Sequence, residues 1–206
     1  MLAWVDIHKM NEEGGVSHDT RSPVLDLGRG TGPADGGTGT GTDGQPTKAL
    51  PIGGVIVGHT ASFIPAGPNV GVDKSTFNGR CSVPSTWVIG FAGKGNFSHL
   101  GQMTFVGSQC TQFNPATGKG TYTDGDFTFV AANGDVLKST HLGSFEIINN
   151  VTHITGGTTV ITGGTGRFTG ASGTMAESGT QDLATDVLDV TYSGSITYDA
   201  SMRARS

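Results

Sequence analysis

Apolar and polar residues alternate along most of the chain from about Lys48 onward. Trp87, Ile89 and Phe91 share one face of such a segment, and Phe127 and Phe129 are in phase in another. A period of two residues is typical of a half-buried β-strand, and no segment shows a convincing helical period. The predicted strands cover residues 54–63, 85–98, 99–113, 120–132, 136–148, 158–162, 172–180 and 188–198.

Short connections separate these predicted strands. Residues 114–120 (NPATGKG) form a turn by composition. Asn133-Gly134 predicts a two-residue hairpin turn of type I′, in which both positions need positive φ. About eight short strands at regular spacing predict an all-β fold, either a β-sandwich or an antiparallel barrel.

The stretch ITGGTTVITGGTGRFTGASGTM at 154–175 is the most glycine-rich part of this region. Its glycine spacing fits neither phosphate-binding pattern, and its seven-residue near-repeat occurs only about twice, too few times for a solenoid. We expect a strand at 158–162, a tight irregular bend and a returning strand at 172–180. In that bend Phe168 would plug one end of a barrel, and Arg167 would bond to carbonyls that the bend leaves bare.

Composition narrows the class of partners. Glycine accounts for 35 of 206 residues, charged residues for only 14%, and the net charge is −5 with no cluster of Lys or Arg. We therefore expect no nucleic-acid partner, which would require a basic face. No apolar run approaches the roughly 18–20 residues of a membrane span, so no span is expected.

The N-terminal part differs from the rest. Residues 28–46 are low-complexity Gly, Thr, Asp and Pro, with too few apolar side chains to offset the entropy of ordering. We expect a flexible, disordered tail and linker at 1–47, a β-domain at 48–200 and a short tail at 201–206. The first residues, MLAWVDIHKMNEE, contain no apolar signal-peptide core. Either the protein is cytosolic or this start is not that of a secreted form.

Four stretches resemble one known family. GGTGRFTGASGTM (163–175) and YSGSITY (192–198) resemble the C-terminal signature of the allene oxide cyclase barrel-like family, and 95–110 and 120–137 resemble its middle strands. The resemblance covers roughly 48–200 and extends more loosely to plant allene oxide cyclases and dirigent proteins. It implies an eight-stranded antiparallel β-barrel of lipocalin-like (calycin) type, and a small secreted bacterial protein. It assigns no catalytic residue here.

Three residues are candidate ligand-binding groups. His99 and His141 lie in the repeated strings SHLG and THLG, and in regular strands each would share a face with apolar neighbours, inside the barrel. Such histidines could bind a ligand or transfer a proton, or they could bond to backbone at a strand end. Glu146 is expected to face water, with an inward role as general acid or base as the alternative.

The two cysteines, Cys81 and Cys110, are either free thiols or one disulfide. A disulfide would close a loop of about 30 residues, stabilise the fold by roughly 3–4 kcal/mol and require an oxidising compartment. Two cysteines alone cannot form a four-ligand zinc site, and no metal or cofactor is expected.

Two functions remain open. The first is a non-enzymatic barrel that binds a small apolar ligand or serves a secreted structural role. The second is a cyclase or isomerase of the allene oxide cyclase type, which would hold an apolar substrate in a reactive shape. An eight-stranded barrel is either filled by side chains or holds one small ligand, so the state of its interior decides between these functions. The oligomeric state is left open.

Overall fold

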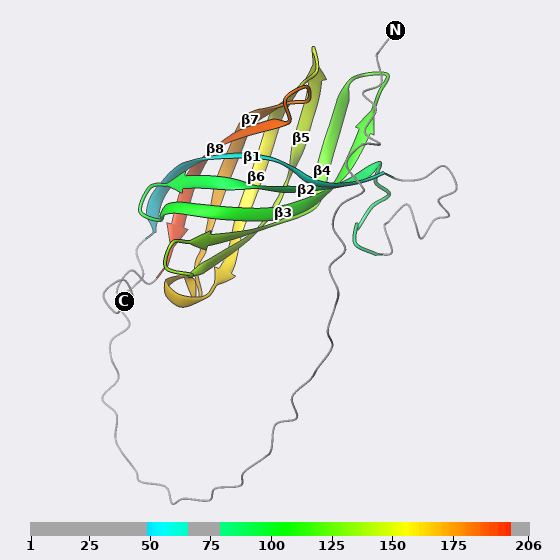
Figure 1. Ribbon diagram of the computed structural model, residues 1–206. Coiled ribbons are helices and arrows are strands. Elements are labelled where there is room, and N and C mark those ends of the chain that lie inside the picture. Colours follow the sequence, from blue (N-terminus) through cyan, green and yellow to red (C-terminus); the bar gives the residue numbers. More distant parts are fainter. Residues whose placement is uncertain (1–48, 66–78, 199–206) are drawn as a thin grey trace, which may run out of the picture. The chain divides into compact units, whose positions relative to one another are not determined.

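The computed structural model describes residues 49–65 and 79–198. These residues form eight antiparallel strands that close into a single barrel, as Figure 1 shows. The predicted all-β class and barrel are therefore confirmed. The predicted tails at 1–47 and 201–206 lie outside the described residues. No helix of the described part is long and apolar enough to cross a membrane.

Every strand pairs with its neighbour in sequence, and β1 also pairs with β8 to close the ring. Closure extends over nine paired positions, from Leu50 opposite Ile196 to Gly58 opposite Leu188. The strands are β1 (Leu50–Pro65), β2 (Trp87–Phe97), β3 (Gly101–Asn114), β4 (Lys119–Ala131), β5 (Val136–Ile148), β6 (Val151–Gly164), β7 (Ser172–Asp182) and β8 (Val187–Thr197).

Alternation along each strand separates the inner wall from the outer wall. In β5, for example, Leu137, Ser139 and His141 are buried, whereas Lys138 and Thr140 are exposed. The buried apolar side chains form one continuous core inside the barrel. Its largest aromatic contacts join Phe97, Phe105, Phe127 and Phe129, with ring centroids 5.4–6.0 Å apart.

The glycine-rich bend forms as predicted and closes one end of the barrel. A 3-10 turn (Gly166–Phe168) follows β6, and the Phe168 side chain is fully buried against Tyr198. Arg167 differs from the prediction that it bonds to carbonyls of the bend: its guanidinium donates to the carbonyl oxygen of Leu100 at 3.0 Å, in the turn between β2 and β3. We call this the closed end; it contains the β2–β3, β4–β5 and β6–β7 connections.

The segment Gly79–Thr86, which we call the strap, is fastened to the outside of β3 and β4. Cys81 and Cys110 form a disulfide, so the disulfide alternative is confirmed and the free-thiol alternative is wrong. The Arg80 guanidinium donates to Ser108 at 2.8 Å and pairs with Asp126 at 3.0 Å. These bonds hold the strap over a small outer cluster of Val88 and the two cysteines.

Two local predictions need correction. Strand β6 begins at Val151, seven residues before the predicted start, because it continues through Gly156 and Gly157 with a bulge. The Asn133-Gly134 turn is in the predicted place but is not of type I′, since only Gly134 has positive φ (86°). Gly134 donates to the carbonyl of Ala131, so the connection is longer than two residues.

Phe168→Ala is expected to lower the free energy of unfolding by about 3–5 kcal/mol, because it leaves a cavity where the phenyl ring fills the closed end. Phe63→Ala is the matched control, since that ring is 39% exposed at the other end of the barrel, and should cost about 1 kcal/mol. Urea unfolding of both variants measures the difference. Equal losses would contradict the assignment of Phe168 as the plug.

Candidate functional site

The end opposite the plug is more accessible to solvent. It carries the turns between β3 and β4, β5 and β6, and β7 and β8, and we call it the open end. Inward-facing side chains of the closed end, such as Phe129 and Ile196, are fully buried. By contrast, the inward-facing Trp87, Ile89 and Gln109 are only partly buried. Inward-facing side chains at this end are therefore partly accessible to solvent.

Aromatic rings line the inner wall of the open end. Phe63 contacts Trp87 with ring centroids 5.7 Å apart, Trp87 stacks on Phe113 at 5.2 Å, and Phe113 stacks on Phe145 at 6.1 Å. We call these four residues the aromatic wall. Stacking of Phe113 on Phe145 requires Gly120 between them, because a Cβ there would overlap the Phe145 ring.

A hollow of about 830 Å³ lies against this part of the barrel. Phe113, Gly120 and Phe145 contribute to its lining. The rest is mostly polar and comes from the strap and from outward-facing positions of β3 to β6, among them Thr86, Gln112, Thr121, Ser144 and Glu146. The hollow thus borders the aromatic wall and provides room for a small molecule at the open end.

A hydrogen-bonded group of buried side chains lies deeper in the barrel. The Tyr122 hydroxyl on β4 donates to Oε2 of Glu177 on β7 at 2.9 Å, and the Thr159 hydroxyl donates to Oε1. Tyr122 reaches Glu177 across two intervening strands. It can do so because Gly143 and Gly157 have no side chain; a Cβ at either position would overlap the Tyr122 hydroxyl.

Burial changes the ionisation of this group. Burial raises the pKa of Glu177, and the two donated hydrogen bonds only partly oppose that rise. Burial together with the neighbouring Glu177 carboxyl also raises the pKa of Tyr122, so the phenol keeps its proton and remains a donor. The carboxyl group is thus held in place by two neutral hydroxyls.

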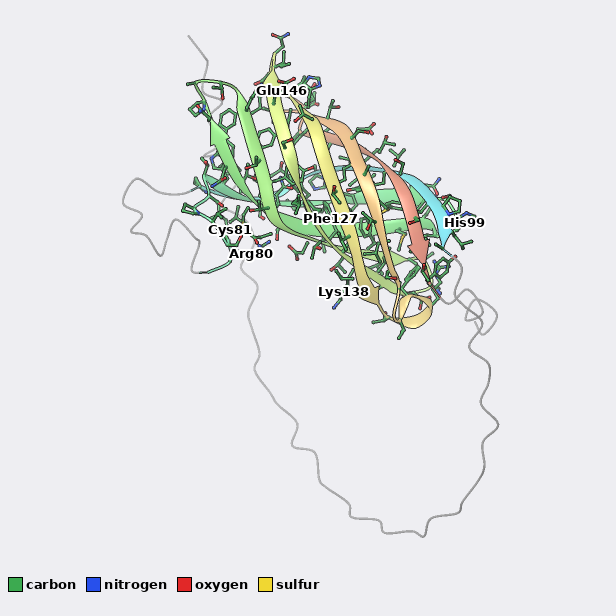
Figure 2. All side chains as sticks on the ribbon, turned by 180° about the vertical axis from the view of Figure 1, so that it is seen from behind. Arg80, Cys81, His99, Phe127, Lys138 and Glu146 are labelled. Atoms are coloured by element: carbon green, nitrogen blue, oxygen red, sulfur yellow. A yellow bond between two sulfur atoms is a disulfide. The ribbon has the colours of Figure 1, made fainter. Side chains whose placement is uncertain are left out.

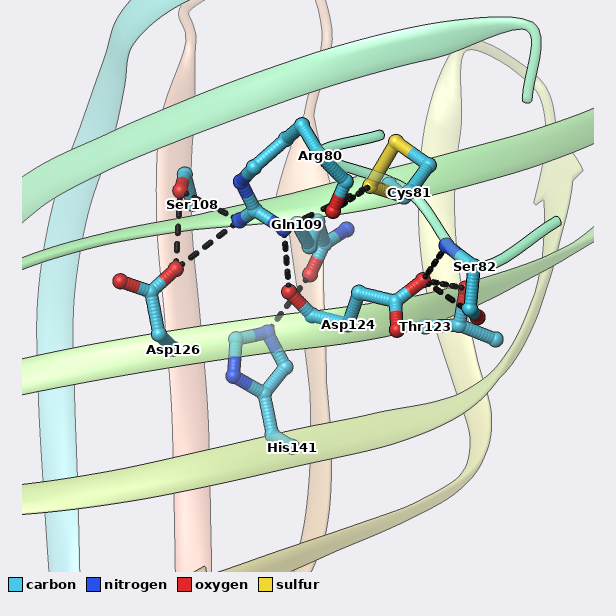
Figure 3. A network of polar contacts seen from close by, with 10 residues as sticks. Arg80, Cys81, Ser82, Ser108, Gln109, Thr123, Asp124, Asp126 and His141 are labelled. Atoms are coloured by element: carbon cyan, nitrogen blue, oxygen red, sulfur yellow. Dashed lines mark hydrogen bonds and ion pairs between the residues drawn. A yellow bond between two sulfur atoms is a disulfide. The ribbon is translucent and has the colours of Figure 1, made fainter. Parts of the chain in front are cut away.

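His141 occupies the neighbouring part of the inner wall. Its imidazole stacks on Phe127 with centroids 4.4 Å apart and fills the space left by Gly125. Figure 3 shows its Nε2 facing Gln109, whose Oε1 lies 2.9 Å away. Nδ1 is buried and has no hydrogen-bond partner in the described part of the chain. Burial lowers the pKa of His141 to about 4, so the ring is neutral near neutral pH.

These groups form a band around the barrel interior. One row of paired positions runs through Trp87, Thr111, Tyr122, Gly143, Gly157 and Glu177. In the next row toward the closed end, His141 pairs with Thr159. We call this set the polar band: Gln109, Tyr122, His141, Thr159 and Glu177. It lies between the aromatic wall and the filled closed end.

The structure separates the three candidates identified from sequence. Only His141 lies in the interior. His99 is exposed in the β2–β3 turn with φ 65°, so the prediction that it shares a face with Met103 and Phe105 is wrong. Glu146 lies outside, opposite Lys119 and His153 on the neighbouring strands. Figure 2 shows His99 and Glu146 near opposite ends of the barrel.

Sequence reasoning missed Tyr122, Thr159 and Glu177. The sequence did contain a signal that Glu177 faces inward, because Glu177 follows Met175 by two residues and so shares the inward face of β7. Nothing local in the sequence links it to Tyr122, which is 55 residues away and reaches it only through two distant glycines.

No protein-family model matches this chain, and no curated protein matches its sequence.

His141 predicts a specific dependence of stability on pH. Its pKa is below the ordinary 6.5 in the native state, so the unfolded chain binds more protons at mildly acidic pH. Stability should therefore fall as the pH drops from 6.5 toward about 4, by up to about 3 kcal/mol from this group. His141→Gln should flatten that part of the profile in urea unfolding, whereas His59→Gln, at an exposed position, should not.

The wild-type protein provides a second test that does not depend on the variant folding. NMR titration of the six histidines should show one imidazole that stays neutral until about pH 4. Titration of all of them near their ordinary value would contradict the buried, neutral state of His141.

Proposed function

We propose that this protein is a small non-enzymatic β-barrel that binds a small apolar ligand in its open end. The observation that carries the proposal is the aromatic wall: Trp87 and Phe113 are partly exposed on an inner surface instead of being packed away. Small-molecule sites are typically concave and apolar, with a few polar groups that fix orientation. The aromatic wall and the polar band beneath it have that composition.

The disulfide supports an extracytoplasmic site of action. Cys81–Cys110 fastens the strap beside the hollow, and disulfides form and persist mainly in oxidising compartments. The resemblance of 163–175 and 192–198 to the allene oxide cyclase barrel-like family points the same way, since that family includes small secreted proteins.

A cyclase or isomerase is the second candidate. The observation that favours it is the pair of buried ionisable side chains, because burial shifts the pKa values of Glu177 and His141 in opposite directions. Ionisable groups whose pKa values are shifted in this way are common in active sites. Mass spectrometry of a ligand recovered after binding distinguishes the two functions: an unchanged ligand fits a binding protein, and a rearranged isomer fits an enzyme.

Binding can be followed through Trp87. The chain has two tryptophans, so Trp4→Phe leaves Trp87 as the sole indole. The apolar dye N-phenyl-1-naphthylamine should gain emission on binding and receive energy from Trp87. In this background Phe113→Ala should weaken dye binding by about tenfold, because one stacked face of the aromatic wall is lost.

Val106→Ala is the control, since that side chain lies on the outer wall and is 58% exposed. It should leave dye binding unchanged, and circular dichroism should show that both variants are folded. Absence of dye binding to the wild-type protein, or equal effects of the two substitutions, would contradict the proposed site.

A further inference from the structure

The Glu177 carboxyl is the starting point, because it is an acid inside a mostly apolar barrel. It is 7% exposed, and within the described part of the chain its hydrogen bonds come only from the neutral hydroxyls of Tyr122 and Thr159. Buried carboxylates are usually paired with a cation, since removing a charge from water is unfavourable. Without a cation beside it, burial favours the neutral carboxyl group, and a bound cation would be the partner that the ionised form lacks.

Within residues 49–65 and 79–198, no cationic side chain supplies that partner. Lys94, Lys119 and Lys138 are exposed. Arg80 pairs with Asp126 on the outer wall, and Arg167 pairs with Asp135 at the closed end. The described part of the protein thus places its cations away from Glu177.

A second acceptor of the polar band also lacks a donor within the described residues. The Gln109 amide oxygen accepts from Nε2–H of His141, so Nδ1 retains a lone pair. This buried atom has no hydrogen-bond partner among residues 49–65 and 79–198. His141 and Glu177 are connected through Thr159, which pairs with His141 across the β5–β6 ladder and donates to Glu177. His141 Nδ1 is therefore a buried acceptor that a hydrogen-bond donor of a ligand could use.

Aromatic side chains lie on the same inner wall of the barrel as these acceptors. Trp87 is in the same row of paired positions as Tyr122 and Glu177, and Phe113 stacks on Trp87. Aromatic faces attract cations, and indole does so most strongly. Aromatic rings on the same inner wall as a carboxyl group and an unpaired imidazole nitrogen are complementary to an alkylammonium group.

From this arrangement we infer that the ligand of the open end is a small organic amine with an apolar or aromatic body. Its ammonium group donates to Glu177, with His141 Nδ1 as a second acceptor, and its body packs on the aromatic wall. The inference rests on the proposed binding function and adds the chemical class of the ligand.

Two ligands of nearly equal shape test this inference. 1-Naphthylmethylamine is cationic near neutral pH, and 1-naphthalenemethanol is neutral. By isothermal titration calorimetry, the wild-type protein should bind the amine at least about tenfold more tightly, as expected for a charge-assisted hydrogen bond in a shielded site. Glu177→Gln should reduce that preference to within about twofold while the alcohol still binds.

Glu146→Gln is the matched control, because that carboxylate lies outside the barrel and its loss should leave the preference intact. Equal binding of both ligands by the wild-type protein would overturn the amine inference and leave the proposed binding function standing. Failure of both ligands and of the apolar dye would instead overturn the binding function itself.

A measurement on the wild-type protein keeps the test decisive if Glu177→Gln does not fold. In the amine complex, the methylene next to the nitrogen should give nuclear Overhauser effects to the methyl group of Thr159. If the methylene gave nuclear Overhauser effects only to outer-wall residues such as Val106, the inference would be overturned.

Discussion

Pairing of β1 with β8 is the interaction on which the rest of the structure depends. Without it the eight strands would form an open sheet with two edges and no enclosed interior. With it, alternate side chains of every strand face one shared tube. Each large inward side chain then needs space that another strand leaves free, so the interior is determined jointly by residues far apart in sequence.

Glycines on the inner wall show how that space is shared. Tyr122 crosses Gly143 and Gly157 to reach Glu177, and His141 lies over Gly125 to reach Gln109. At the closed end the space is occupied by phenyl rings and by Phe168. The same principle thus produces a solid hydrophobic half and a half in which polar groups extend across the wall. This asymmetry makes the open end the part of the barrel where we propose that a ligand binds.

Much of the architecture could be predicted from sequence because it depends on local rules. Period-two alternation located the strands, and the bend around Phe168 followed from its glycines. His99 shows the limit of the parity argument, because it lies in the β2–β3 turn with positive φ and not in the strand that begins at Gly101. The polar band could not be predicted, because the Tyr122–Glu177 contact depends on the register of four consecutive strands and on two bulges.

Amide hydrogen exchange measured by NMR tests barrel closure most directly. In a closed ring, alternate amides between Gly54 and Gly58 of β1 donate toward β8 and the others donate toward β2. Closure predicts that both sets exchange as slowly as amides in β4 and β5. Rapid exchange of the set facing β8, together with the facing amides of Leu188–Ile196, would mean that the sheet is open and would contradict this account.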